Sequence, residues 1–121
     1  MILVVEDDED VRALVNATLG GDMGYHVIPT SGGSSALEIL HSDQHIDLLF
    51  TDVVMPGGMS GLQLAEHAHD CRPELPIMLT SGYNEEFISA KPAVGANLPL
   101  IRKPFRRSDL GDAIASLLKS E

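Results

Sequence analysis

Carboxylates, a hydroxyl group and an ammonium group follow separate apolar stretches of this sequence. Glu6 and Asp7 come after the first stretch, Asp52 after another, Thr80 after a third and Lys103 after a fourth. Three carboxylates brought close together would repel one another, and a Mg²⁺ ion would remove that repulsion. The hydroxyl and the lysine could hold phosphoryl oxygens while one carboxylate attacks the phosphorus atom. These residue types therefore predict Mg²⁺-dependent phosphoryl transfer to a carboxylate, provided that the fold brings them together.

The apolar stretches have the length and composition of buried β-strands. Short β-branched runs bounded by turn residues are typical of a parallel sheet covered on both faces. Five such strands are expected, over residues 2–5, 25–30, 47–51, 77–79 and 98–102. They alternate with helical patterns, which predicts an α/β fold with a flavodoxin-like, doubly wound, five-stranded parallel sheet in the order 2-1-3-4-5. In that order, strands one, three, four and five deliver their polar ends to one rim of the sheet.

Local signals predict where the helices and the second strand begin and end. Glycines at 20, 21 and 24 are expected to end the first helix, whose apolar stripe includes Leu14, and the second strand, over residues 25–30, is expected to stop near Pro29. Ser34 or Ser35 is expected to cap the second helix, and Ser108 the last one. Ser60 and Gln63 have the spacing of a capping box, with Pro73 ending the helix behind it. Residues 83–97 predict only a short or irregular fourth helix.

Composition and charge limit the classes of function. The 121 residues are 44% hydrophobic, which suits one domain over residues 1–121. The net charge of −10 argues against direct nucleic-acid binding. No apolar run approaches the roughly 20 residues of a membrane span, and no secretory signal is visible, so no membrane insertion and a cytoplasmic location are expected. The lone Cys71 is expected to be half-buried rather than reactive.

At this point the chain resembles a known family, the receiver domains of bacterial response regulators in two-component signalling. The resemblance rests on motifs that span nearly the whole chain: residues 4–8 (VVEDD), 51–56 (TDVVMP) with Gly61 after them, 79–81 (LTS) and 102–105 (RKPF). The segment 80–84 (TSGYN) and the Gly57-Gly58 pair look most like receivers attached to hybrid histidine kinases.

The resemblance implies a role for each residue of the predicted site. Asp52 would be the phosphoacceptor, in a Mg²⁺-dependent reaction with a phosphohistidine donor on a histidine kinase or a histidine phosphotransfer domain. Asp7 would bind Mg²⁺ directly, Glu6 mainly through water, and the main-chain carbonyl of Val54 would also bind the ion. Thr80 and Lys103 would each hold a phosphoryl oxygen.

The sequence also departs from the family at two informative points. Two glycines, 57 and 58, stand where many members have one residue, and Leu100 occupies a position that is often Tyr or Phe. An aromatic switch at that position is therefore not available. Residues 83–97 form a dimer face in many members, so their weak helical pattern favours a monomer.

Two other functions remain open on the sequence. One is an aspartyl-phosphate hydrolase, although Val54 stands where such enzymes usually carry a second acid. The other is an interaction module of the same fold that is not phosphorylated. The leading hypothesis is a phosphoacceptor signalling domain that catalyses its own phosphorylation and dephosphorylation and is not an enzyme with turnover.

Overall fold

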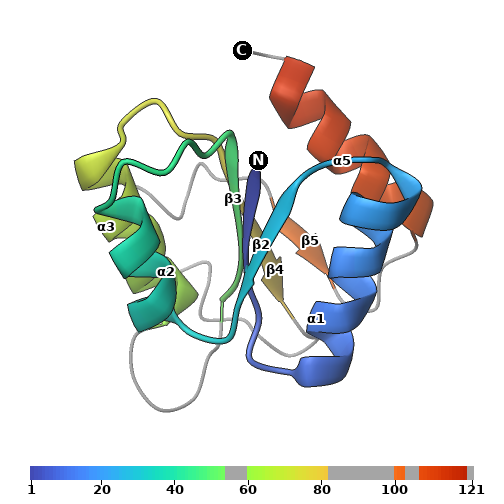
Figure 1. The fold of residues 1–121 in the computed structure, drawn as a ribbon, viewed down its shortest axis with the longest axis horizontal. Coiled ribbons are helices and arrows are strands. Elements are labelled where there is room, and N and C mark those ends of the chain that lie inside the picture. Colours follow the sequence, from blue (N-terminus) through green and yellow to red (C-terminus); the bar gives the residue numbers. More distant parts are fainter. Residues whose placement is uncertain (54–59, 82–99, 103–106, 120–121) are drawn as a thin grey trace.

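A five-stranded parallel sheet forms the centre of the molecule, with helices on both faces (Figure 1). The computed structural model describes residues 1–53, 60–81, 100–102 and 107–119. The strands are β1 (Ile2–Val5), β2 (Val27–Thr30), β3 (Leu48–Asp52), β4 (Ile77–Ser81) and β5 (Leu100–Arg102), and their order is β2-β1-β3-β4-β5. The predicted fold class and strand order are therefore confirmed.

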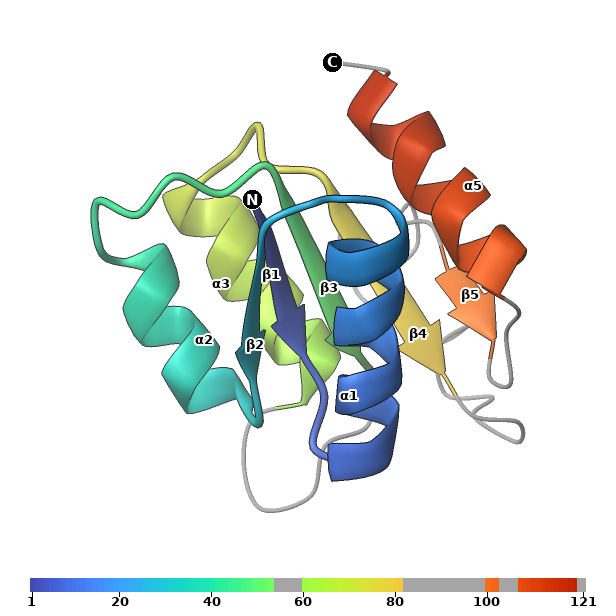
Figure 2. The ribbon, with the colours of Figure 1, turned by 45° about the vertical axis from the view of Figure 1, so that its right-hand side comes forward.

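The helices divide into two layers. They are α1 (Glu9–Asn16), continued by the π-helix η1 (Ala17–Asp22), then α2 (Gly33–Leu40), α3 (Gly61–Cys71) and α5 (Arg107–Lys119). The α2 and α3 helices cover one face of the sheet, and α1 and α5 cover the other (Figures 1 and 2). The irregular fourth helix predicted over 83–97 lies outside the described residues.

The strand β1 contributes to the core on both faces of the sheet. Leu3 and Val5 pack with residues of α2 and α3, whereas Ile2 and Val4 pack with residues of α1 and α5. All four side chains are fully buried. Because successive side chains of a strand point to opposite faces, a shift of one residue would exchange the two sets. The register of β1 is thus fixed from both sides, and so is the position of the acids that follow it.

Side-chain caps fix the first turns of two helices next to the carboxyl ends of the strands. The carboxylate of Asp8 accepts hydrogen bonds from the backbone N–H groups of Asp10 and Val11, at 2.9 and 3.1 Å. Ser60 and Gln63 form the predicted capping box, in which each side chain accepts from the other residue's backbone N–H. Such caps satisfy N–H groups that have no partner within the helix.

The structure corrects the predicted end of the first helix and the predicted start of the second strand. The first helix does not end at Gly20 and Gly21 but passes through both as the wider η1 turns, and it ends at Asp22, before Gly24 with its φ of 76°. The second strand ends at Thr30, next to Pro29, as predicted, but it starts at Val27 rather than at residue 25; Pro29 lies within β2, opposite Val4. The carbonyls of His26 and Thr30 accept hydrogen bonds from the N–H groups of Ile2 and Glu6. Since alternate residues face opposite ways, the nitrogen of Pro29 points away from β1, where a missing N–H breaks no strand pairing.

Several side-chain predictions were also wrong. Gly32 caps α2, and Ser34 and Ser35 lie inside its first turn; a glycine costs little in that position. The α5 helix starts at Arg107, so Ser108 lies inside it rather than before it. On the helix surfaces, Leu14 is 43% exposed and Cys71 is exposed rather than half-buried.

Candidate functional site

Three acidic side chains converge where β1 and β3 end. Glu6, Asp7 and Asp52 each offer a carboxylate oxygen, and these three atoms lie within 4.8 Å of one another. The two strands are neighbours, with Val5 paired to Thr51, so the residues that follow them reach the same rim. Glu6 is fully buried, Asp52 is 5% exposed and Asp7 is exposed. The predicted meeting of these acids is confirmed.

The donor set of this acidic cluster fits a hard divalent cation. Carboxylates held this close repel one another, and in a partly buried place the repulsion is only weakly reduced by solvent. Around an octahedral Mg²⁺ ion, with ligands at about 2.1 Å, neighbouring oxygens are roughly 3 Å apart and opposite ones roughly 4 Å. The oxygens of the cluster lie within 4.8 Å of one another, so small side-chain adjustments would bring them to these separations. The exposed Asp7 leaves the cluster open to water, and Mg²⁺ usually keeps several water ligands.

Hydrogen bonds fix the turn that carries Glu6 and Asp7. The backbone N–H of Glu6 donates to the carbonyl of Thr30 at 3.1 Å, and its carboxylate accepts from the N–H of Asp8, also at 3.1 Å. Arg12, in α1, donates from Nη1 to the backbone carbonyl of Glu6 at 2.9 Å. The sequence analysis did not identify Arg12; the signal available was a basic residue two positions after the five acids of residues 6–10.

The backbone of Asp52 is in close contact with the start of α3. The N–H of Gly61 donates to the carbonyl of Val53 at 2.8 Å. A Cβ atom added to Gly61 would lie 1.7 Å from the backbone oxygen of Asp52 and 2.9 Å from the Cα of Val53. Only glycine fits here, because the obstructing atoms are backbone that cannot rotate away. In the sequence Gly61 was recognisable only as part of a family motif.

Thr80 lies directly beside Asp52 in the sheet. The two residues are paired in the β3–β4 register, and the carbonyl of Thr80 accepts from the N–H of Val53 at 2.9 Å. Its side chain is fully buried, and its hydroxyl makes no hydrogen bond with any other described residue. A buried hydroxyl without a partner costs about 1–3 kcal/mol, so this group is well placed to bind a ligand oxygen. The predictions for Lys103 and Val54 fall outside the described residues.

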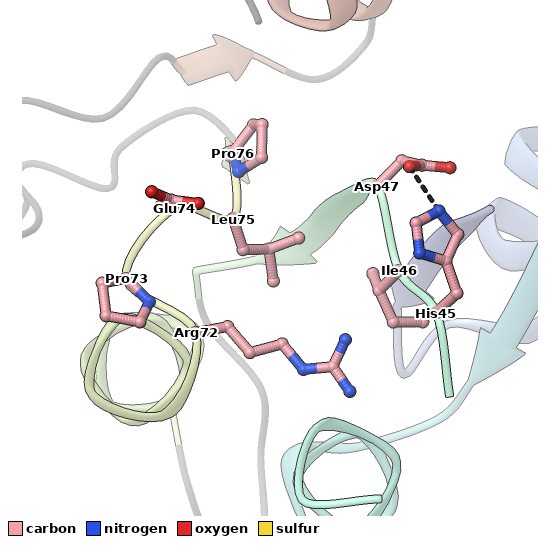
Figure 3. A pocket seen from close by; sticks show the side chains of 8 residues that line it. All are labelled: His45, Ile46, Asp47, Arg72, Pro73, Glu74, Leu75 and Pro76. Carbon is pink, nitrogen blue, oxygen red and sulfur yellow. Dashed lines mark ion pairs between the residues drawn. The ribbon is translucent and has the colours of Figure 1, made fainter. Parts of the chain in front are cut away.

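A cavity of about 470 Å³ lies at the opposite rim, near the amino ends of β3 and β4 (Figure 3). The carboxylate of Asp47 pairs there with Nε2 of His45 and with the ammonium group of Met1, both at 2.7 Å. Arg72 donates to the carbonyls of Leu40 and Ser42, at 3.1 and 3.0 Å. These polar groups in the cavity are engaged with the protein itself, so we assign them a structural role.

Comparison with known proteins identifies the family. The family model described as response regulator receiver domain matches residues 2–115, which include every residue of the acidic cluster. The chain belongs to the response regulator receiver domain family. Receiver domains are the regulatory phosphoacceptor modules of two-component signalling, so the predicted family and general function are confirmed.

Individual relatives agree with this assignment. The response regulator receiver protein CpdR of Brucella abortus is 35% identical over 97% of the chain and 95% of its own length. A receiver protein from Sinorhizobium medicae, whose crystal structure is known, has a TM-score of 0.85 at 30% identity, covering 98% of this chain and 93% of that one.

Longer proteins contain a similar stretch. The sensor kinase CckA of Brucella abortus is 29% identical over 99% of the chain, but the chain spans only 13% of its length. Relatives of both kinds are therefore found, and attachment to a hybrid kinase stays a prediction. No helix in the described part of the chain is long and apolar enough to cross a membrane.

Proposed function

We propose that Asp52 accepts a phosphoryl group from a phosphohistidine donor on a histidine kinase or a histidine phosphotransfer domain. The observation that carries this proposal is the meeting of Glu6, Asp7 and Asp52 at one rim of the sheet, with oxygen atoms within 4.8 Å. Asp52 is the acid of this cluster that belongs to a strand, and it lies beside the buried hydroxyl of Thr80.

In the proposed reaction, a carboxylate oxygen of Asp52 attacks the phosphorus atom. The phosphorus–nitrogen bond of the donor breaks, and the imidazole leaves with the electron pair. The hydroxyl of Thr80 donates to one phosphoryl oxygen, and the ammonium group of Lys103 pairs with another.

Glu6, Asp7, Asp52 and the carbonyl of Val54 would hold the Mg²⁺ ion. When bound, the ion supplies positive charge that offsets both the carboxylates and the phosphoryl oxygens. The repulsion among the three acids favours cation binding, and this argument is independent of the family assignment.

The remaining features of the proposal follow from a role in signalling. The chain would catalyse only its own phosphorylation and dephosphorylation, and would act as one receiver domain over residues 1–121. We expect a monomer in the cytoplasm. We also expect no direct binding of nucleic acid, because the chain has 18 acidic and only 8 basic residues and its net negative charge repels phosphate groups.

The test is the intact mass of the protein after incubation with acetyl phosphate or phosphoramidate and Mg²⁺. The wild type is expected to gain one phosphoryl group, and Asp52→Asn none. Asp43→Asn is the matched control, since Asp43 is exposed and lies outside the cluster. Phosphorylation of Asp52→Asn to the wild-type level would refute the assignment of Asp52.

The same experiment separates the two alternative functions. A hydrolase with an aspartyl-phosphate intermediate would consume the donor without retaining a stoichiometric phosphoryl adduct. An interaction module that is not phosphorylated would show no added mass with or without Mg²⁺. A stoichiometric adduct that forms only with Mg²⁺ would exclude both.

A further inference from the structure

Arg12 links the first turns of α1 to the end of β1. Its side chain donates from Nη1 to the backbone carbonyl of Glu6 at 2.9 Å, six residues earlier in the chain. Its own backbone N–H donates to the carbonyl of Asp8 at 2.9 Å. Arg12 therefore contacts both ends of the turn formed by Glu6, Asp7 and Asp8, and its side chain is partly buried as it does so.

This turn decides where the acid pair points. Asp7 is exposed, so packing contributes little to the placement of its carboxylate, which depends on the backbone on either side. On the side of β1 the backbone is held by the N–H of Glu6 bonded to Thr30. On the carbonyl side of Glu6, where the peptide plane leads directly to Asp7, Arg12 donates to the Glu6 carbonyl, and the N–H of Asp8 donates to the Glu6 carboxylate. Without the bond from Arg12, that peptide plane would be free to rotate, and the backbone that leads into Asp7 would lose one of its restraints.

We propose that Arg12 is a positioning residue of the cation site, acting through the main-chain carbonyl of Glu6. The proposal rests on the function proposed above, because it concerns the same acidic cluster. Arg12 binds neither the cation nor the phosphoryl group. It holds the turn in the conformation in which the oxygens of Glu6, Asp7 and Asp52 lie within 4.8 Å. Groups that orient metal ligands typically change metal affinity by 10–100-fold when they are removed.

Two simpler roles for Arg12 predict different results. If its positive charge alone mattered, removing it would tighten cation binding, because a cation would no longer be repelled. If it only stabilised the fold, its loss would lower the melting temperature and leave cation affinity unchanged. A positioning role predicts weaker binding at temperatures where the protein remains folded.

The experiment measures Mg²⁺ affinity directly by calorimetric titration of the full chain, without any phosphoryl donor. Arg12→Met is expected to bind Mg²⁺ about tenfold more weakly than the wild type. Arg12→Lys keeps a charged donor and is expected to recover most of that loss. Arg72→Met is the matched control, because Arg72 also donates to backbone carbonyls but at the opposite rim. Its affinity for Mg²⁺ is expected to equal that of the wild type.

Several outcomes would overturn the proposal. They are unchanged or tighter Mg²⁺ binding by Arg12→Met, an equal loss in Arg12→Met and Arg12→Lys, and a similar loss in Arg72→Met. If Arg12→Met does not fold, Arg12→Gln takes its place with the same expected weakening. Failure of the wild type to bind Mg²⁺ would instead remove the proposed cation site as a whole, and the inference with it.

Discussion

The acidic side chains at the two rims of the sheet have opposite electrostatic surroundings. At the amino rim, Asp47 lies between the Met1 ammonium group and His45, with both contacts at 2.7 Å. At the carboxyl rim, Asp52 lies among carboxylates, with Glu6 and Asp7 close enough to share one ion. The first arrangement stabilises the folded chain by itself, whereas the second raises its energy until a cation binds. Paired charges such as those around Asp47 stabilise the fold. Like charges held close together, as in the acidic cluster, destabilise it and are typical of functional sites.

The largest expected effect is the loss of stability when the close backbone contact at the carboxyl rim is disturbed. Gly61→Ala would place a Cβ atom 1.7 Å from the backbone oxygen of Asp52, and is expected to lower the free energy of unfolding by about 3 kcal/mol or more. Gly21→Ala is the control, since nothing lies within 4 Å of its added Cβ, and it should be neutral or stabilising by up to about 1 kcal/mol. Urea denaturation measures both variants. Equal stability of Gly61→Ala and the wild type would show that the close contact is not real.

Addition of Mg²⁺ should act through the carboxyl rim alone. At 100 times its dissociation constant, the ion is expected to raise the free energy of unfolding by about 2.7 kcal/mol. Asp7→Asn should lose most of this gain, because it removes one charged ligand from the cluster. Asp47→Asn should retain all of it. Thermal melts with and without Mg²⁺ measure the effect, and equal gains in the two variants would contradict the assigned position of the site.

Without Mg²⁺, the same two substitutions should change stability in opposite directions. Asp7→Asn relieves repulsion and is expected to stabilise the chain by about 1 kcal/mol, a value kept small by the exposure of Asp7. Asp47→Asn breaks ion pairs and is expected to destabilise it. Denaturation in a buffer containing a chelator tests both signs. If Asp7→Asn destabilised the chain, repulsion within the acidic cluster would not be lowering the stability of the folded state.

The smallest effect concerns pH at the amino rim. The hydrogen bond from the Met1 ammonium group, aided by its charge and by His45, holds the pKa of Asp47 below its usual value. The resulting stabilisation is present above the unfolded pKa of about 3.9, and it is lost as the pH falls through the lower, folded-state pKa. The Asp47 side chain is 41% exposed, so solvent screening limits the effect to at most about 1 kcal/mol.

The measurement is the difference in unfolding free energy between the wild type and Asp47→Asn. The difference should shrink as the pH falls below about 4. Asp43→Asn serves as the control for an exposed acid on the same loop. A difference that grows as the pH falls would have the wrong sign for this mechanism.

The sequence predicted the strand order and the acidic cluster because both depend on strong, regular signals. Buried runs such as Ile2–Val5 identify strands, and the order of the strands then decides which ends meet. Packing details left no such signal. The passage of the first helix through Gly20 and Gly21 depends on tertiary contacts that outweigh the weak helix propensity of glycine.

Contacts made by the backbone were equally hard to foresee. The bond from Arg12 to the carbonyl of Glu6 and the approach of Gly61 to Asp52 involve main-chain atoms, which are the same in every residue. A pattern of side-chain types carries no information about them. The site could therefore be predicted at the level of its acids but not of the groups that hold those acids in place.

Pro29 affects the tendency of the protein to aggregate through the edge of its sheet. It lies in β2, at one edge of the described sheet, and its nitrogen points away from β1. An edge strand with free N–H donors invites a strand from a second chain to add to the sheet. The proline removes a donor from the middle of that edge, so strand-by-strand aggregation is blocked where the sheet would otherwise be open to it.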